Sequence, residues 1–157
     1  MASWMIHLRI ADKLLDRLNN ITTTEFIIGN IAPDSGVPNE DWSAFTPSGD
    51  ISHFKDESID GWKNVNIERF IKTHFTKEHI EGYSKNEFSF FLGYFTHLLT
   101  DIEWVKQICL PSEERFADLC AEIGRVNFIW TLKKDWYDLD FLYLKKNAKL
   151  ISYHCNV

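Results

Sequence analysis

The residue pair best suited to chemistry is His97 and Asp101, within the segment 84–104, SKNEFSFFLGYFTHLLTDIEW. A spacing of four residues places both side chains on one side of a helix, one turn apart. Phe90 and Tyr94 precede them on the same stripe, so the pair lies on or beside the buried face. An imidazole and a carboxylate buried there need a partner, because an unpaired buried charge is costly. Two solutions are open: a hydrogen bond between the two side chains, or a shared divalent metal ion.

The helix that must position this pair has a clear start. Ser84 followed by Glu87 is a capping box, in which each residue satisfies a backbone N–H at the helix start. Apolar residues also recur at helical spacing elsewhere, and they predict further helices over 4–20, 26–31, 67–75, 112–130 and 135–146. No segment alternates as a strand would. The sequence therefore predicts an all-α fold, a multi-helix bundle forming a single domain over 1–157.

Breakers and turns divide the predicted helices. Gly29 is expected to interrupt the helix over 26–31, and Pro33 to end it. The stretch 37–64 shows no helical or alternating period, yet it contains aromatic residues that an unstructured linker would lack. It is predicted to be a long ordered loop, and loops of that length in compact domains are often functional.

Three further residues have side chains that bind metals, and each has an ordinary alternative. His7 lies on the apolar face of the first predicted helix, where a histidine is usually a hydrogen-bonded core residue. Asp34 lies in the turn APDSG, where aspartate commonly forms or caps the turn. His53 lies in the long loop, where most histidines are solvated. His74 and His79, near a helix C-terminus, are interpreted as solvated or as favourable charges there.

Composition excludes several classes of protein. The chain has 157 residues, of which 45% are hydrophobic and 15% aromatic, so it has ample core material. A net charge of −6 without a basic run disfavours binding to nucleic acid. No apolar stretch approaches the roughly 20 residues of a membrane span, and no signal peptide is expected. The three cysteines lack a CxxC spacing and are predicted to be thiols in a reducing, cytoplasmic compartment.

Taken together, the local contexts of these residues resemble the zinc-dependent phospholipase C family, whose helical fold is shared with the P1-type nucleases. The resemblance rests on SWMIHLRIADKLL, GNIAPDSG, SHF and FLGYFTHLLTDIEW, in that order, over roughly the first two-thirds of the chain. The APD element and the G-Y-x-x-H-x-x-x-D element are the most specific parts.

The resemblance implies a metal site with named ligands. Asp34, His53, His97 and Asp101 would surround one zinc ion, and His7 would help Asp101 to hold another. In the family, the amino group and carbonyl of the first residue of the mature chain complete that second site. The family also has a further His and a His-x-x-x-Glu downstream. This chain has no histidine between His97 and His154, so one or two ions are expected.

Residues that could replace the missing ligands are Glu103, Asp138 and Asp140, and nothing in the sequence selects among them. The donor set suits Zn²⁺, and Mn²⁺ or Fe²⁺ would also fit.

The function implied is hydrolysis of a small phosphoester or a lipid headgroup by metal-activated water, with Asp34 as general base. Tyr94 and Phe54 are candidate pocket residues, although core packing is the ordinary role of such aromatics. The alternative is a metal-stabilised binding or structural protein without activity. A helical phosphohydrolase of the HD type is disfavoured, because no His in the chain is followed by Asp.

Overall fold

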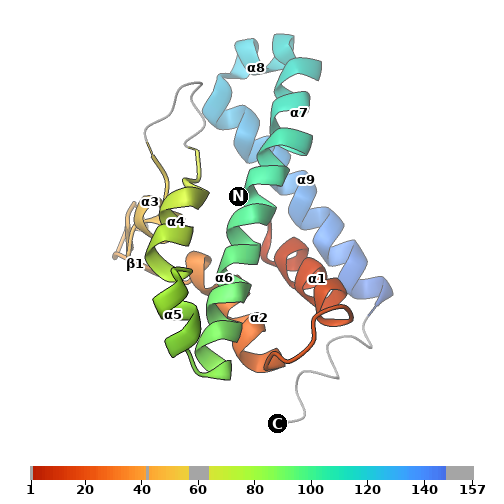
Figure 1. Ribbon diagram of the computed structural model, residues 1–157. Coiled ribbons are helices and arrows are strands. Elements are labelled where there is room, and N and C mark those ends of the chain that lie inside the picture. Colours follow the sequence, from red (N-terminus) through yellow and green to blue (C-terminus); the bar gives the residue numbers. More distant parts are fainter. Residues whose placement is uncertain (1, 42, 57–63, 148–157) are drawn as a thin grey trace. The chain divides into compact units, whose positions relative to one another are not determined.

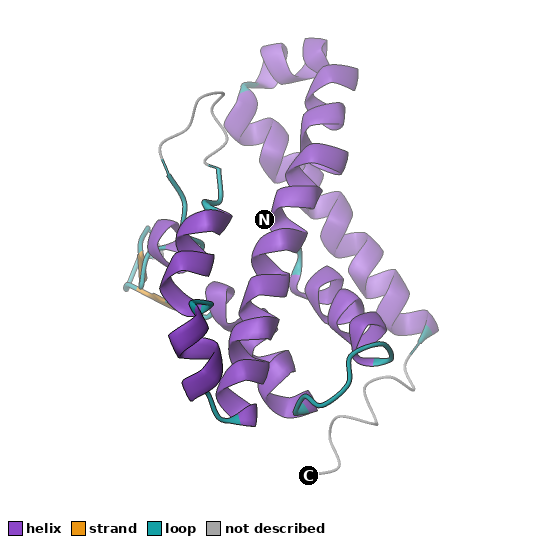
Figure 2. Ribbon diagram, viewed as in Figure 1, coloured by secondary structure: helices purple, strands orange, loops and turns teal. Residues whose placement is uncertain are grey.

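The computed structural model describes residues 2–41, 43–56 and 64–147 (Figure 1). The chain divides into two compact units, Met1–Lys106 and Gln107–Val157. The predicted pattern of an all-α fold is confirmed: helices dominate the described residues, and the two strands they contain are only two residues long (Figure 2). That the chain functions as one domain stays a prediction.

The first unit contains the residues singled out for chemistry. Its helices are α1 (Trp4–Leu15), α2 (Thr23–Ile31), α3 (Gly49–Ser52), α4 (Ile67–His74), α5 (Lys77–Gly82) and α6 (Lys85–Trp104). A 3₁₀ turn, η1 (Ala32–Asp34), follows α2 directly. The strands β1 (Val37–Pro38) and β2 (Phe45–Thr46) form a small antiparallel hairpin, with Val37 opposite Thr46 and Pro38 opposite Phe45.

Helices make up most of the described residues of the second unit. A π-helical stretch, η2 (Val105–Cys109), follows α6 and leads into α7 (Leu110–Arg115), α8 (Ala117–Ile123) and α9 (Arg125–Lys146). The sequence prediction of helices over 112–130 and 135–146 is wrong in detail. Gly124, with a φ of 79°, separates α8 from α9, and no proline or glycine interrupts the chain from there to Lys146. Cys109 and Cys120 are not joined in a disulfide.

Helix α6 is the centre of the first unit, and its start is as predicted. The Ser84 side chain accepts a hydrogen bond from the Glu87 backbone, and the Glu87 carboxylate accepts one from the Ser84 backbone at 2.9 Å. The helix then runs unbroken through His97 and Asp101 to Trp104. Leu98 on this helix and Phe26 and Phe70 from its neighbours are fully buried, so the apolar core of the unit lies along α6.

Helices α2 and α6 lie in direct backbone contact, and two glycines make this contact possible. A Cβ at Gly29 would lie 1.9 Å from the Phe90 carbonyl oxygen, and a Cβ at Gly93 would lie 2.0 Å from that of Phe26. The expectation that Gly29 interrupts its helix is therefore wrong. Gly29 lies inside a continuous α2, because the missing side chain lets the two helices approach each other.

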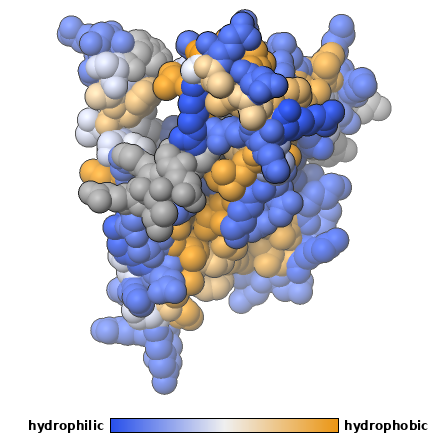
Figure 3. Space-filling model, turned by 90° about the horizontal axis from the view of Figure 1, so that it is seen from above, coloured by the Kyte–Doolittle hydropathy of each residue, from blue (hydrophilic) through white to orange (hydrophobic). Residues whose placement is uncertain are grey.

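The long predicted loop over 37–64 is partly structured. It contains the β1–β2 hairpin and the single turn of α3, while residues 42 and 57–63 lie outside the described residues. The first helix is shorter than the predicted 4–20, ending at Leu15. No described helix combines the length and the apolar character needed to cross a membrane. On the face shown in Figure 3, hydrophobic residues form an area near the middle, with hydrophilic residues around it.

Candidate metal centre

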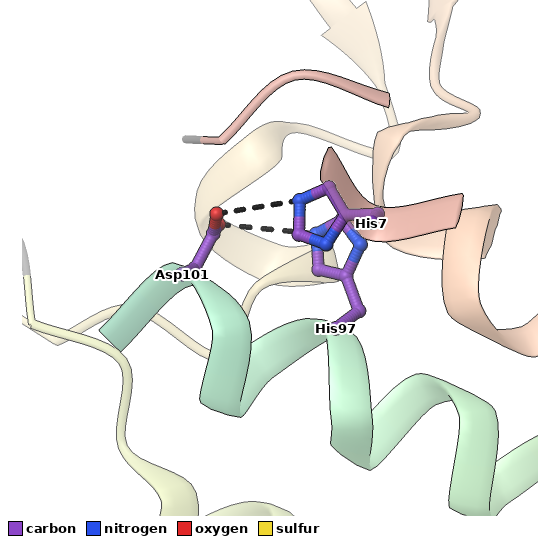
Figure 4. A group of neighbouring side chains, drawn as sticks. All are labelled: His7, His97 and Asp101. Atoms are coloured by element: carbon purple, nitrogen blue, oxygen red, sulfur yellow. Dashed lines mark ion pairs between the residues drawn. The ribbon is translucent and has the colours of Figure 1, made fainter. Parts of the chain in front are cut away.

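Helix α6 presents His97 and Asp101 together in the buried interior, as the four-residue spacing predicts. Nε2 of His97 lies 3.8 Å from Oδ2 of Asp101, and both side chains are almost completely excluded from solvent. His7 comes from α1 and stacks on His97, with ring centroids 3.7 Å apart and the planes 7° from parallel. Figure 4 shows the two rings side by side, both facing the Asp101 carboxylate.

Asp34 and His53 join this group from the other side. Asp34 ends the η1 turn, and His53 is the residue directly after α3. Nε2 of His53 lies 3.1 Å from Oδ1 of Asp34, 3.6 Å from Oδ2 of Asp101 and 3.2 Å from Nε2 of His97. The structure therefore brings together all five residues that the resemblance implies as ligands, from segments spread over the first hundred positions.

The orientation of two histidines is set by backbone carbonyls. Nδ1 of His97 lies 2.7 Å from the Asn30 carbonyl oxygen, and Nδ1 of His53 lies 3.0 Å from that of Gly49. A carbonyl oxygen only accepts hydrogen bonds, so each Nδ1 carries the proton and donates it. When a ring is neutral, this arrangement leaves a lone pair on its Nε2, and the two Nε2 atoms face each other across 3.2 Å. Two lone pairs at that distance repel unless a proton or a metal ion lies between them.

The spacing of the donor atoms fits a zinc ion. With bonds of about 2.0–2.1 Å, tetrahedral zinc holds neighbouring ligand atoms roughly 3.3 Å apart. The separations of His53 Nε2 from His97 Nε2 and from Asp34 Oδ1 are 3.2 and 3.1 Å. The distance from His97 Nε2 to Asp34 Oδ1 is longer, at 4.0 Å. Two imidazole nitrogens with carboxylate oxygens are donors that zinc accepts, so these residues fit the metal.

A second group of donors lies beside the first and shares Asp101. Nε2 of His7 is 3.5 Å from Oδ1 of Asp101, which is longer than a normal hydrogen bond. Both ring nitrogens of His7 are buried without a hydrogen-bond partner among the described residues. Buried polar atoms nearly always have a partner, so this histidine is a further candidate ligand. The Ala2 backbone N–H donates to the same Asp101 oxygen at 2.9 Å.

Electrostatics keeps His97, Asp34 and Asp101 in the protonation state that metal binding requires. Burial, together with the neighbouring His7, lowers the pKa of His97 to about 3, so its ring is neutral at physiological pH. Burial works to raise the pKa of Asp34, but its close contact with the His53 ring contributes to a net lowering of the pKa. Burial also opposes ionisation of Asp101, yet its contact with His7 contributes to a lowered pKa. Neutral imidazoles and ionised carboxylates are the forms that ligate metals.

Solvent reaches the group mainly at Asp34. Its side chain is 20% exposed, whereas those of His7, His97 and Asp101 are at most 1% exposed. A water molecule or a substrate would therefore approach the donor atoms from the side of Asp34. Glu103, considered as a substitute ligand, is instead exposed and pairs with Lys106 at 3.2 Å.

The two predicted pocket residues belong to an aromatic cluster next to the donors. The Phe54 ring packs edge-on against Phe70 at 5.1 Å, and the Tyr94 ring stacks on the same Phe70 at 5.3 Å. His74, interpreted from sequence as solvated, stacks on Phe91 at 4.5 Å, and partial burial lowers its pKa. That Phe54 and Tyr94 contact a substrate stays a prediction.

Sequence reasoning missed three backbone contributors to the site, the carbonyls of Asn30 and Gly49 and the Ala2 N–H. None of them carries a side-chain signal, because almost every residue type supplies these groups. The position of Asn30 in the sequence, four residues before Asp34, indicates a role at the site only when the crossing of α2 and α6 is known.

A comparison with protein-family models matches residues 6–104 to the family described as zinc dependent phospholipase C. The chain belongs to the zinc-dependent phospholipase C family. The matched segment covers more than half of the chain and includes all five candidate ligands, and the resemblance inferred from the sequence is confirmed. Searches of curated proteins and of solved structures gave no match. The second unit lies beyond the matched residues.

Proposed function

We propose that this protein is a metal-dependent phosphoric ester hydrolase that holds zinc on Asp34, His53, His97 and Asp101. The observation that carries the proposal is the convergence of four side chains: the Nε2 atoms of His53 and His97 lie 3.2 Å apart beside the carboxylates of Asp34 and Asp101, and Nδ1 of each ring lies at a backbone carbonyl. His7 and the other oxygen of Asp101 provide donors for a second ion, so we propose one or two ions per chain. Membership of the zinc-dependent phospholipase C family supports the choice of metal.

The residues of this chain have separable roles in that reaction. Zinc bound at these residues would act as a Lewis acid. It would lower the pKa of a water molecule towards neutral pH and polarise a phosphoryl oxygen. Asp34 is ionised and is the ligand that solvent reaches, so it accepts the proton of the attacking water. The water oxygen bonds to phosphorus as the ester P–O bond breaks, and the alcohol leaves with a proton from solvent. The buried His7, His97 and Asp101 fix the position of the ions, and the Asp101 carboxylate balances part of their charge.

The substrate class that we propose is a small phosphodiester or a phospholipid headgroup. The net charge of −6 disfavours a long polyanion, because binding nucleic acid depends on neutralising many phosphates. A cytoplasmic location also remains our proposal.

A second candidate function is metal binding without catalysis. It is favoured by one specific observation, the absence of any histidine between His97 and His154, where the resemblance implies further ligands. A site lacking those ligands would bind zinc and stabilise the fold without assembling the complete cluster.

Elemental analysis of the purified protein combined with a hydrolysis assay separates the two functions. The hydrolase is expected to contain one or two zinc ions per chain and to cleave bis-p-nitrophenyl phosphate, whereas the binding protein would contain zinc without turnover. His97→Ala should remove the metal and lower the melting temperature. His79→Ala, on the exposed surface and away from the donors, is the matched control and should retain both. Unchanged metal content in His97→Ala would refute the ligand assignment.

A further inference from the structure

His53 follows a much shorter helix than the one that contains His97. Helix α3 is a single turn, Gly49–Ser52, and His53 follows it directly. Helix α6, by contrast, has 20 residues. For the two Nε2 atoms to share a cation, the short segment must be held against α6 in one position.

Tyr94 makes a direct connection between these two elements. It lies on α6, three residues before His97, and its hydroxyl donates a hydrogen bond to the Ser52 carbonyl oxygen. Ser52 is buried and is the last residue of α3, where a helix carbonyl lacks a partner within the helix. The hydroxyl thus anchors the peptide unit that leads directly into His53.

Side-chain contacts then carry this anchoring to the imidazole. Nδ1 of His53 lies 3.0 Å from the Ser52 hydroxyl oxygen and 3.0 Å from the Gly49 carbonyl oxygen. Both partners belong to the turn that Tyr94 holds. Fixing that turn therefore fixes the direction of the opposite nitrogen, Nε2, which faces Asp34 and His97.

The aromatic cluster holds the Tyr94 ring so that its hydroxyl points at Ser52. The ring stacks on the fully buried Phe70, with 27° between the planes. Phe54 has a φ of 52°, in the left-handed region, and its ring packs against the same Phe70. Burial raises the pKa of Tyr94 to about 12, so the hydroxyl keeps the proton it donates.

We propose that Tyr94 is a positioning residue for the metal centre, acting through the Ser52 carbonyl to hold His53 in line with His97. This inference rests on the proposed function, since it assumes that the donors bind zinc. Groups that orient metal ligands in this way typically change metal affinity about 10–100-fold when removed.

The test compares Tyr94→Phe with Tyr83→Phe. The first removes only the hydroxyl and keeps the ring on Phe70. The second removes a hydroxyl from the neighbouring part of the aromatic cluster, where the Tyr83 ring stacks on Phe91 and His79. Zinc affinity is measured by competition with a chelating dye, and the visible absorption spectrum of the Co²⁺-loaded protein reports ligand geometry. Tyr94→Phe should bind zinc about 10–100-fold more weakly, with an altered Co²⁺ spectrum, and Tyr83→Phe should match the unmutated protein.

A double-mutant cycle separates positioning from a general loss of stability. In a His53→Ala background, Tyr94→Phe should cause no further loss of zinc affinity, because its effect passes through His53. An equal loss in both backgrounds would overturn the inference, as would zinc affinity within twofold of the unmutated protein together with an unchanged Co²⁺ spectrum. Absence of zinc binding by the unmutated protein would instead overturn the proposed function, and this inference with it.

Discussion

The crossing of α2 and α6 predicts that Gly93→Ala will disrupt both the fold and the metal centre. An added Cβ would lie 2.0 Å from the Phe26 carbonyl oxygen and 2.9 Å from the Asn30 backbone nitrogen. Real Cβ contacts essentially never fall below 3.0 Å, so the two backbones must separate by about 1 Å. Neither obstacle is a flexible side chain that can rotate away. The same displacement would move the Asn30 carbonyl away from Nδ1 of His97.

The magnitude follows from three contributions. Overpacking a well-packed core costs about 1–3 kcal/mol. Losing the buried hydrogen bond of His97 destabilises the fold by about 1–3 kcal/mol more. Replacing glycine by alanine within a helix stabilises it by about 1 kcal/mol. The expected net loss in the free energy of unfolding is about 3 kcal/mol. For a chain of this size it corresponds to a melting temperature lower by roughly 6–12 °C.

Urea denaturation of the metal-free protein measures the stability change, and zinc titration measures the effect on the site. Gly82→Ala is the matched control, because Gly82 is also helical and a Cβ added there would meet nothing within 4 Å. It should be neutral or stabilising by at most about 1 kcal/mol. If Gly93→Ala were as stable as Gly82→Ala and bound zinc equally well, the close approach of α2 and α6 could not be what positions Asn30 against His97.

Two further predictions concern protonation and catalysis. The metal-free protein should lose stability as the pH falls from about 6.5 towards about 3, by up to about 1.4 kcal/mol per pH unit, because the unfolded chain protonates His97 in this range whereas the folded chain keeps it neutral. Urea denaturation across that range should show a shallower dependence in His97→Gln, and an identical dependence would show that His97 contributes nothing. Asp34→Asn should retain part of the bound metal but lose hydrolysis of bis-p-nitrophenyl phosphate, since an amide cannot accept the proton; full turnover would exclude Asp34 as the base.

Local patterns in the sequence determined the elements whose structure depends only on residues within the element. The capping box at Ser84 and the spacing of His97 and Asp101 placed the central helix and its chemical face, because both features depend only on neighbours within one or two turns. The same reasoning failed where the outcome depended on a partner. Gly29 reads as a break in isolation, but in the folded chain it lets α2 lie against the backbone of α6. In the second unit, the helix predicted over 112–130 crosses Gly124, but the positive φ of this residue separates α8 from α9.

The convergence of the donors was accessible to sequence only through the resemblance to a family. Nothing local to Asp34 or His53 distinguishes a metal ligand from a turn aspartate or a loop histidine. The tertiary structure alone decided that their side chains lie within 4.0 Å of His97, and that backbone carbonyls of Asn30 and Gly49 select which ring nitrogens face the site. The physical reason is that the sequence gives the chemical type of each ligand side chain. The orientation of that side chain is set by contacts between segments that are distant in the chain.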